Sequence, residues 1–170
     1  LAHALDHFDL HPEGFICLDV GASTGGFTDC MLQRGAQRVY ALDVGYGQLV
    51  HQLRQDPRVI VMERINARYL ESDALPEKVD LITIDVSFIS LLKVVPPLLV
   101  HLAADGMLLP MIKPQFEAGR YQVGKGGIVR DMEVRQRVIE ERVAELGALG
   151  LEALQGGAFD SPVTGKEGNR

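Results

Sequence analysis

The sequence is poor in cysteine and aromatic residues, and it contains no tryptophan. Its two cysteines, Cys17 and Cys30, and its five scattered histidines show none of the spacings that bind zinc. We therefore expect neither a disulfide-stabilised secreted protein nor a metal site. With two thiols and no signal-peptide pattern, the expected location is the reducing cytoplasm.

Long apolar runs and an excess of positive charge are also missing. The apolar stretch 91–102 is broken by Lys93, Pro96, Pro97 and His101, and no segment reaches the roughly 18 apolar residues of a membrane span. The formal net charge is −6, whereas a domain that grips nucleic acid alone is usually basic. The composition, 46% hydrophobic, indicates a globular domain. We expect no membrane partner, and any nucleic acid would need a separate binding module.

Apolar strand-like runs alternate with helix-like runs along the chain. Several runs are continuously apolar, as in strands that are covered on both faces. This alternation predicts one α/β domain over residues 1–170, with a mostly parallel, doubly wound sheet. The expected strands are Phe15–Val20, Val39–Val44, Val59–Glu63, Val79–Val86, Met107–Lys113 and Leu151–Ala158, and the expected helices are Leu1–Phe8, Phe27–Arg34, Gln48–Gln55, Leu91–Ala103 and Met132–Leu146.

The stretch 17–30, CLDVGASTGGFTDC, joins a strand to a helix through a glycine loop. A dinucleotide loop has a second glycine that lets the backbone approach a pyrophosphate, and Ser23 stands there instead. No G-K-[ST] follows, which excludes a P-loop. S-adenosylmethionine carries no phosphate, and its methionine group needs a carboxylate and backbone groups. We therefore expect S-adenosylmethionine as cofactor, bound by Asp19 and by Gly21, Ala22, Ser23, Thr24, Gly25, Gly26 and Phe27.

Two further residues follow strands on the side where a cofactor would lie. Asp43 ends the second strand about twenty residues beyond the loop, where a carboxylate can accept hydrogen bonds from both ribose hydroxyls. It would suit NAD equally well, and a surface turn before Gly45 is the alternative. Asn66, after the third strand, is expected either to reach the adenine edge or to cap a helix.

Ionisable residues near strand ends indicate chemistry on a hydroxyl group. The fourth strand leads into DVSF at 85–88, which lacks the D-P-P-Y turn of amino-directed methyltransferases, and both cysteines are explained as small buried hydrophobes. DNA is therefore not an expected partner. Asp85, Lys113 and Glu167 lie at or beyond strand ends that would converge on one cleft, with Asp85 also bordering the cofactor. Lys113 could take a proton from a hydroxyl as a general base, and a solvated surface lysine is the alternative.

The stretch 113–130, KPQFEAGRYQVGKGGIVR, interrupts the alternation with four glycines. Long loops in compact domains usually carry a function. We expect this loop to be mobile in the free protein and to order on RNA, with phosphate contacts from Arg120, Lys125 and Arg130. An idle surface loop is the alternative.

Six ordered motifs resemble those of the TlyA-type proteins, some of which are labelled hemolysins. These motifs are LDVGASTGGFTD, ALDVGYGQL, DVSFIS, KPQFE, VGKGGIVRD and SPVTGKEGN, and together they span nearly all of the chain. TlyA-type proteins belong to the FtsJ/RrmJ-like ribose methyltransferases. The resemblance implies a Rossmann-like fold that uses S-adenosylmethionine and 2′-O-methylation of ribosomal RNA, with cytidine as the target. It also implies that Asp85, Lys113 and Glu167 match the last three members of a Lys-Asp-Lys-Glu tetrad, with Lys113 as the base.

The chain departs from that family pattern at its beginning. The first tetrad lysine and an S4-like RNA-binding domain would both precede Leu1. We therefore expect a chain trimmed at both ends, with impaired activity on its own. Three alternatives stay open: a hemolysin-type membrane-acting protein, a dehydrogenase-type binder, and a catalytically silent module that binds S-adenosylmethionine or RNA. The expected helix 132–146 mixes acids and bases, unlike the cationic helices that bind membranes.

Overall fold

A computed structural model describes residues 1–124 and 128–163. The chain divides into two compact units. The first comprises Leu1–Val86 and Val94–Met111, and the second comprises Ser87–Lys93 and Ile112–Arg170. Among the helices of the described residues, none combines the length and apolar character needed to cross a membrane. A single domain over 1–170 stays a prediction.

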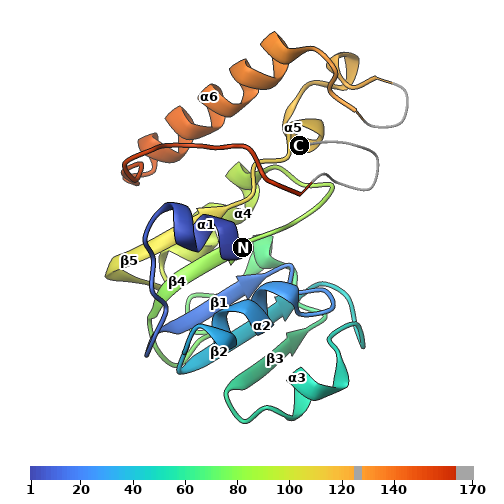
Figure 1. The fold of residues 1–170 in the computed structure, drawn as a ribbon. Coiled ribbons are helices and arrows are strands. Elements are labelled where there is room, and N and C mark those ends of the chain that lie inside the picture. Colours follow the sequence, from blue (N-terminus) through green and yellow to red (C-terminus); the bar gives the residue numbers. More distant parts are fainter. Residues whose placement is uncertain (125–127, 164–170) are drawn as a thin grey trace. The chain divides into compact units, whose positions relative to one another are not determined.

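The first unit is built on a five-stranded parallel sheet with the strand order β3-β2-β1-β4-β5 (Figure 1). This confirms the predicted α/β class with a parallel, doubly wound sheet. The order reverses between β1 and β4, and ligands of such sheets bind beyond the carboxyl ends of the strands at this switch point. The strands are β1 (Ile16–Val20), β2 (Arg38–Asp43), β3 (Val59–Glu63), β4 (Val79–Ile84) and β5 (Leu102–Pro110).

The helices follow local signals that the sequence displays. Asp131 caps α6 by accepting the backbone N–H groups of Glu133 and Val134, and Gly25 opens α2 in the left-handed region at φ 102°. The elements are α1 (Ala2–His7), α2 (Gly26–Gln33), α3 (His51–Gln55), the 3₁₀ turn η1 (Ala67–Tyr69), α4 (Leu91–Leu99), α5 (Pro114–Glu117), η2 (Arg120–Gln122) and α6 (Met132–Ala148).

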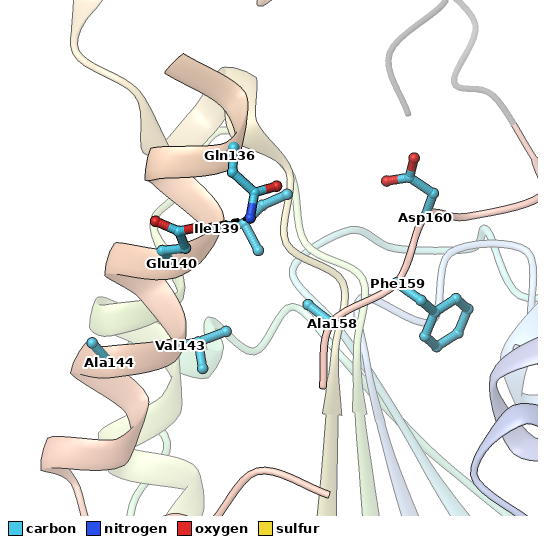
Figure 2. Close-up of a pocket in the computed structure, with 8 residues that line it drawn as sticks. All are labelled: Gln136, Ile139, Glu140, Val143, Ala144, Ala158, Phe159 and Asp160. Carbon is cyan, nitrogen blue, oxygen red and sulfur yellow. Dashed lines mark hydrogen bonds between the residues drawn. The ribbon is translucent and has the colours of Figure 1, made fainter. Parts of the chain in front are cut away.

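The second unit contains α5, η2 and α6 and a shallow groove of about 540 Å³ along α6 (Figure 2). Ile139 and Val143 of α6 face the groove from one side, and the segment 158–160 lies on the other. Arg135 of α6 forms an ion pair with Asp160 of that segment.

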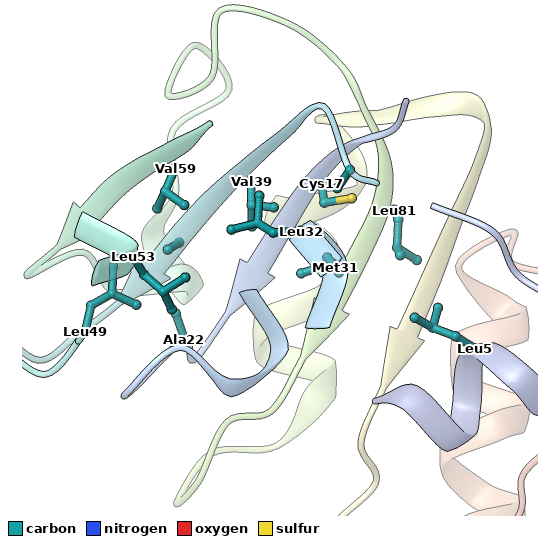
Figure 3. Packing of buried hydrophobic residues seen from close by; sticks show 12 residues of the cluster. Leu5, Cys17, Ala22, Met31, Leu32, Val39, Leu49, Leu53, Val59 and Leu81 are labelled. Carbon is teal, nitrogen blue, oxygen red and sulfur yellow. The ribbon is translucent and has the colours of Figure 1, made fainter. Parts of the chain in front are cut away.

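The core of the first unit lies between the sheet and the helices that pack on it. Met31 and Leu32 of α2 gather with Cys17 of β1 and Val39 of β2 (Figure 3). Cys17 is fully buried, and this burial raises the pKa of its thiol to about 12. The thiol is therefore protonated at neutral pH and acts as the small core hydrophobe expected from the sequence.

One predicted element is absent, and two others have different bounds. Residues 151–158, all described, form no strand, and within them Gly156 and Gly157 adopt φ values of 102° and 59° that strands exclude. The predicted helix Leu91–Ala103 ends at Leu99 instead, and β5 starts at Leu102 rather than at Met107. The early part of β5, AADG at 103–106, lacks a continuous apolar run, and the register between β4 and β5 shifts after the Val79–Leu102 pair.

Candidate functional site

The β1–α2 loop turns sharply through three left-handed residues. Gly21, Ser23 and Gly25 have φ values of 85°, 49° and 102°. An added Cβ would overlap the Asp85 carbonyl oxygen at Gly21 and the Leu53 side chain at Gly25. Both conformation and space therefore require glycine at these two positions.

At Gly26, neither the backbone conformation nor the surrounding space requires glycine. Its φ lies outside the left-handed region, and an added Cβ would meet no heavy atom within 4 Å. Gly26 is also the first residue of α2, a position that does not call for glycine. The open space at this helix start suits a ligand that approaches the backbone closely.

Asp43 connects the end of β2 to the same loop. Its Oδ2 accepts the Ser23 backbone N–H at 2.8 Å, and its Oδ1 accepts the Gly45 N–H at 2.7 Å. The Ser23 hydroxyl donates to Gln48 Oε1 at 3.4 Å. A carboxylate has about four lone-pair sites, so Asp43 can also accept from hydroxyl donors of a ligand. The sequence placed Asp43 at a strand end, but no local pattern revealed its bond to Ser23.

Asp19 lies beneath this loop with a fully buried side chain. Its two carboxylate oxygens accept the hydroxyls of Thr28 in α2 at 2.7 Å and of Thr83 in β4 at 3.0 Å. Burial raises the pKa of Asp19 to about 6, and the two hydroxyl hydrogen bonds oppose this rise. Asp19 thus ties α2 and β4 to the end of β1, and its direct contact with a cofactor stays a prediction.

Asn66 and Asp85 complete the expected cofactor residues of the first unit. The Asn66 side chain accepts the Arg68 backbone N–H at 3.1 Å and so caps η1. This is the helix-cap role weighed from the sequence, and contact with adenine stays a prediction. The Asp85 backbone N–H donates to the Val20 carbonyl at 2.9 Å, which fixes Asp85 beside the end of β1.

An exposed aromatic residue, Tyr46, lies near Asp43 and was not predicted from the sequence as part of the site. The Tyr46 side chain is 68% exposed, and the Arg64 guanidinium lies 4.1 Å from the centre of its ring. Arg64 has a φ of 60°, an uncommon conformation for a residue with a side chain. The two residues belong to the loops after β2 and β3, and only the folded chain brings them together.

Lys113 belongs to the second unit and lies three residues after the end of β5. It is the N-cap residue of α5, and its Nζ donates to the Ser87 hydroxyl at 3.0 Å. Asp85 belongs to the first unit, so the predicted pairing of Asp85 with Lys113 stays a prediction. Glu167, the third predicted catalytic residue, lies outside the described residues.

The predicted loop 113–130 is only partly irregular. It contains α5, η2 and an antiparallel bridge between Gly124 and Ile128. Arg130 is exposed, Arg120 belongs to η2, and Lys125 lies outside the described residues. Contact of these three with RNA, and ordering of the loop on RNA, stay predictions. The described residues contain no group of three or more His, Cys, Asp or Glu that could hold a metal ion.

Comparison with known proteins gives consistent matches. The mycobacterial 16S/23S rRNA (cytidine-2′-O)-methyltransferase TlyA, from Mycobacterium tuberculosis, is 48% identical over 174 residues, which cover 99% of this chain and 62% of that protein. The structure of a candidate hemolysin from Streptococcus thermophilus has a TM-score of 0.93 and 47% identity, over 98% of this chain and 60% of that one. The chain thus spans about three-fifths of the length of these relatives.

A more distant structure shares the fold alone. An S-adenosylmethionine-dependent methyltransferase from Mesorhizobium loti has a TM-score of 0.58 at 17% identity, over 84% of this chain and 80% of that one. The family model that describes FtsJ-like methyltransferases matches residues 1–170. The chain therefore belongs to the FtsJ-like methyltransferase family.

Proposed function

We propose that the protein transfers a methyl group from S-adenosylmethionine to the ribose 2′-hydroxyl of a cytidine in ribosomal RNA. The family supports the reaction type, and the name of the mycobacterial relative supports the substrate. The structural observation that carries the proposal is the Asp43 carboxylate, which holds the glycine loop through Ser23. The Asp43 carboxylate oxygens can accept further hydrogen bonds, and they lie at the carboxyl end of β2, where ribose hydroxyls would donate them.

The residues of the first unit fit S-adenosylmethionine. The open space at Gly26 leaves room for close backbone approach, and Asp43 offers oxygens to the ribose hydroxyls. The loop 21–27 would face the methionine group, and Asn66 would face the adenine. Asp19, buried below, ties the end of β1 to the start of α2 through Thr28. When bound, S-adenosylmethionine supplies an activated methyl group on its sulfonium sulfur.

Lys113 acts in this proposal as the general base. Its Nζ accepts the proton of the ribose 2′-hydroxyl and so makes that oxygen nucleophilic. The Ser87 hydroxyl, 3.0 Å from Nζ, restrains the flexible lysine side chain. Asp85 and Glu167 orient the lysine and the ribose. General base catalysis contributes about 10²–10⁴-fold to a rate, and this is the contribution that Lys113 would make.

The RNA partner would be held largely through its phosphates. Arg120, Lys125 and Arg130 supply positive charge in a chain whose net charge is −6, so a further binding module of the full-length protein would provide most of the affinity. A ribosomal substrate also implies that the protein works in the cytoplasm.

The test has a binding arm and a transfer arm. Calorimetric titration with S-adenosylmethionine and, separately, with NAD should give heat only with the first, and tight binding of NAD alone would contradict the proposal. The full-length protein, given ribosomal subunits and cofactor with a labelled methyl group, should add one 2′-O-methyl group at a cytidine, located by mass spectrometry. Cofactor binding without transfer would indicate a silent module, and leakage of liposomes without transfer would favour the hemolysin reading.

A further inference from the structure

Two segments of the second unit, 87–91 and 113–117, contact each other at both ends and in the middle. Lys113 Nζ donates to the Ser87 hydroxyl at 3.0 Å. The rings of Phe88 and Phe116 lie 4.8 Å apart between their centres. At the far end, Glu117 receives hydrogen bonds from Ser90 and Leu91. The segment with the proposed base is thus fixed to the start of α4.

Glu117 contacts three residues of this arrangement through its carboxylate. Its Oε2 accepts the Ser90 hydroxyl at 2.7 Å, and its Oε1 accepts the Leu91 backbone N–H at 2.8 Å. Arg142 of α6 approaches Oε2 at 3.5 Å and also pairs with Glu145 at 2.6 Å. The Glu117 side chain is only 2% exposed and that of Arg142 only 14%. A carboxylate from one segment therefore binds the start of α4 and the middle of α6.

Burying such a carboxylate is costly unless its hydrogen bonds are well made, and apolar residues of similar size often give equal stability. Stability alone is therefore a weak reason for a glutamate here. Its three donors come from two other segments, 90–91 and α6, so the charge fixes one arrangement of these segments. Its place at the first turn of α4 also favours a negative charge.

The α5 turn links Glu117 to Lys113. Lys113 is the N-cap and Glu117 the last residue of this helix. The Phe116 N–H donates to the Lys113 carbonyl at 2.9 Å, and Pro114 restricts the backbone at the first helical position. A single hydrogen-bonded turn moves as a unit, so a shift at Glu117 would also displace the Lys113 amine.

We propose that Glu117 is a positioning residue that sets the location of the Lys113 amine through the α5 turn and the segment 87–91. This inference rests on the proposed function of Lys113 as the base. It predicts that Glu117 affects the rate of proton removal more than it affects binding of cofactor or RNA.

The first experiment needs neither RNA nor cofactor. Acetic anhydride labels lysine amines, and mass spectrometry reports the rate at Lys113 with Lys78 as the internal reference. Glu117→Gln should change the Lys113 rate by at least about threefold, since a hydrogen bond to a charged group is lost. Glu141→Gln is the matched control, because Glu141 forms an exposed pair with Arg137 on α6 at 3.7 Å, outside this arrangement. An unchanged Lys113 rate in Glu117→Gln would overturn the proposal.

The second experiment measures single-turnover methyl transfer by the full-length protein at saturating cofactor and RNA. Glu117→Gln should lower the rate by about 10–100-fold, the scale expected for a misplaced catalytic group. The dissociation constants of cofactor and RNA should stay within about threefold, since neither ligand is proposed to touch Glu117. A normal rate in Glu117→Gln beside a normal control would also overturn the proposal.

A second pair of variants covers the case in which Glu117→Gln fails to fold. Ser90→Ala removes one donor to Glu117, and Ser90→Thr keeps the hydroxyl. The alanine variant should show a smaller change in the Lys113 labelling rate and a smaller loss of methyl transfer than Glu117→Gln does. The threonine variant should return both rates to the wild-type values. Equal behaviour of the two Ser90 variants would contradict the inference. If the wild-type protein transfers no methyl group to RNA, the proposed function fails, and the labelling experiment still decides whether Glu117 positions Lys113.

Discussion

The carboxylate of Asp43 accepts the backbone N–H of Ser23 at 2.8 Å, although 20 positions separate the two residues. This bond joins the end of β2 to the β1–α2 loop and holds Ser23 in its left-handed conformation at φ 49°. One side chain therefore shapes the glycine loop, and in the proposed function the same side chain would offer acceptor oxygens to the cofactor ribose. A change at Asp43 should affect both tasks.

Replacement of Asp43 by alanine should weaken S-adenosylmethionine binding by roughly 1–3 kcal/mol, the usual cost of losing hydrogen bonds to a charged group. Isothermal titration calorimetry measures this effect. Asp105→Ala is the control, since Asp105 is an exposed carboxylate in β5 of the same unit. Equal affinities of the two variants would remove Asp43 from the cofactor site.

The neighbouring glycines Gly25 and Gly26 should respond in opposite ways to alanine. Gly25→Ala should destabilise the fold by roughly 1–3 kcal/mol, because an added Cβ overlaps Leu53 and φ is 102°. Gly26→Ala should leave stability unchanged or slightly raised, yet weaken cofactor binding by filling the open space. Thermal unfolding and calorimetry on both variants separate these effects. Undiminished affinity in Gly26→Ala would show that no ligand approaches there.

Asp19 should make the fold less stable as the pH rises from about 4 to about 6. Its pKa is raised by burial from an ordinary 3.8 to about 6, so the folded state binds more protons than the unfolded state in this window. The stability that protonated Asp19 contributes is lost as the pH rises through the folded-state pKa. Above that pH, Asp19 causes no further change in stability. At about 1.4 kcal/mol per pKa unit, the loss is roughly 2–4 kcal/mol.

Asp19→Asn tests this pH dependence, because asparagine has no ionisable side chain at that position. Urea unfolding of both proteins at several pH values between about 4 and 7 gives the difference in unfolding free energy, which should change through this window and level off above it. Other carboxylates titrate equally in the two proteins and cancel. A difference that stays constant across this range would mean that Asp19 keeps an ordinary pKa.

The strand–helix alternation predicted the parallel sheet because continuous apolar runs such as Val79–Ile84 leave few other ways to bury both faces. The strand ends likewise placed Asp43 and Asp85 correctly beside the carboxyl ends of β2 and β4. These features depend on residues close together in the chain.

What the sequence did not predict depends on contacts between distant residues. Three sets of contacts form only in the folded chain. They are the hydrogen bond from Ser23 to Asp43, the bonds from Thr28 and Thr83 to buried Asp19, and the bond from Ser90 to Glu117. At 151–158 the sequence predicted a strand that the structure does not contain. That stretch contains the adjacent residues Gly156 and Gly157, whose positive φ values do not occur in strands.

Charge reversal at Arg130 should weaken RNA binding and flatten its salt dependence. Arg130 is exposed, and loss of one phosphate contact should reduce the slope of log K against log salt by about one. Binding of the full-length Arg130→Glu protein to ribosomal RNA, measured at several salt concentrations, gives this slope. Arg137→Glu serves as control, since Arg137 is 53% exposed on α6 and has no proposed RNA contact. A slope identical to that of the wild type would place Arg130 outside the RNA interface.

Lys113→Arg should abolish most of the methyl transfer while leaving the cofactor bound. Arginine keeps the positive charge but does not deprotonate in proteins, so it cannot accept the 2′-hydroxyl proton. The single-turnover rate of the full-length protein should therefore fall at least about a hundredfold, the lower range of general base catalysis. Calorimetry with S-adenosylmethionine provides the control, because Lys113 has no proposed contact with the cofactor.

The pH dependence of the same reaction gives an independent test of Lys113. A lysine must lose its proton before it can accept one, so the wild-type rate should rise with pH towards an alkaline plateau. Lys113→Arg should lose this rise together with the rate. A variant that transfers methyl groups within severalfold of the wild-type rate would show that Lys113 only positions the substrate through its charge. In that case the proton of the 2′-hydroxyl would have to leave by a route that does not involve this amine.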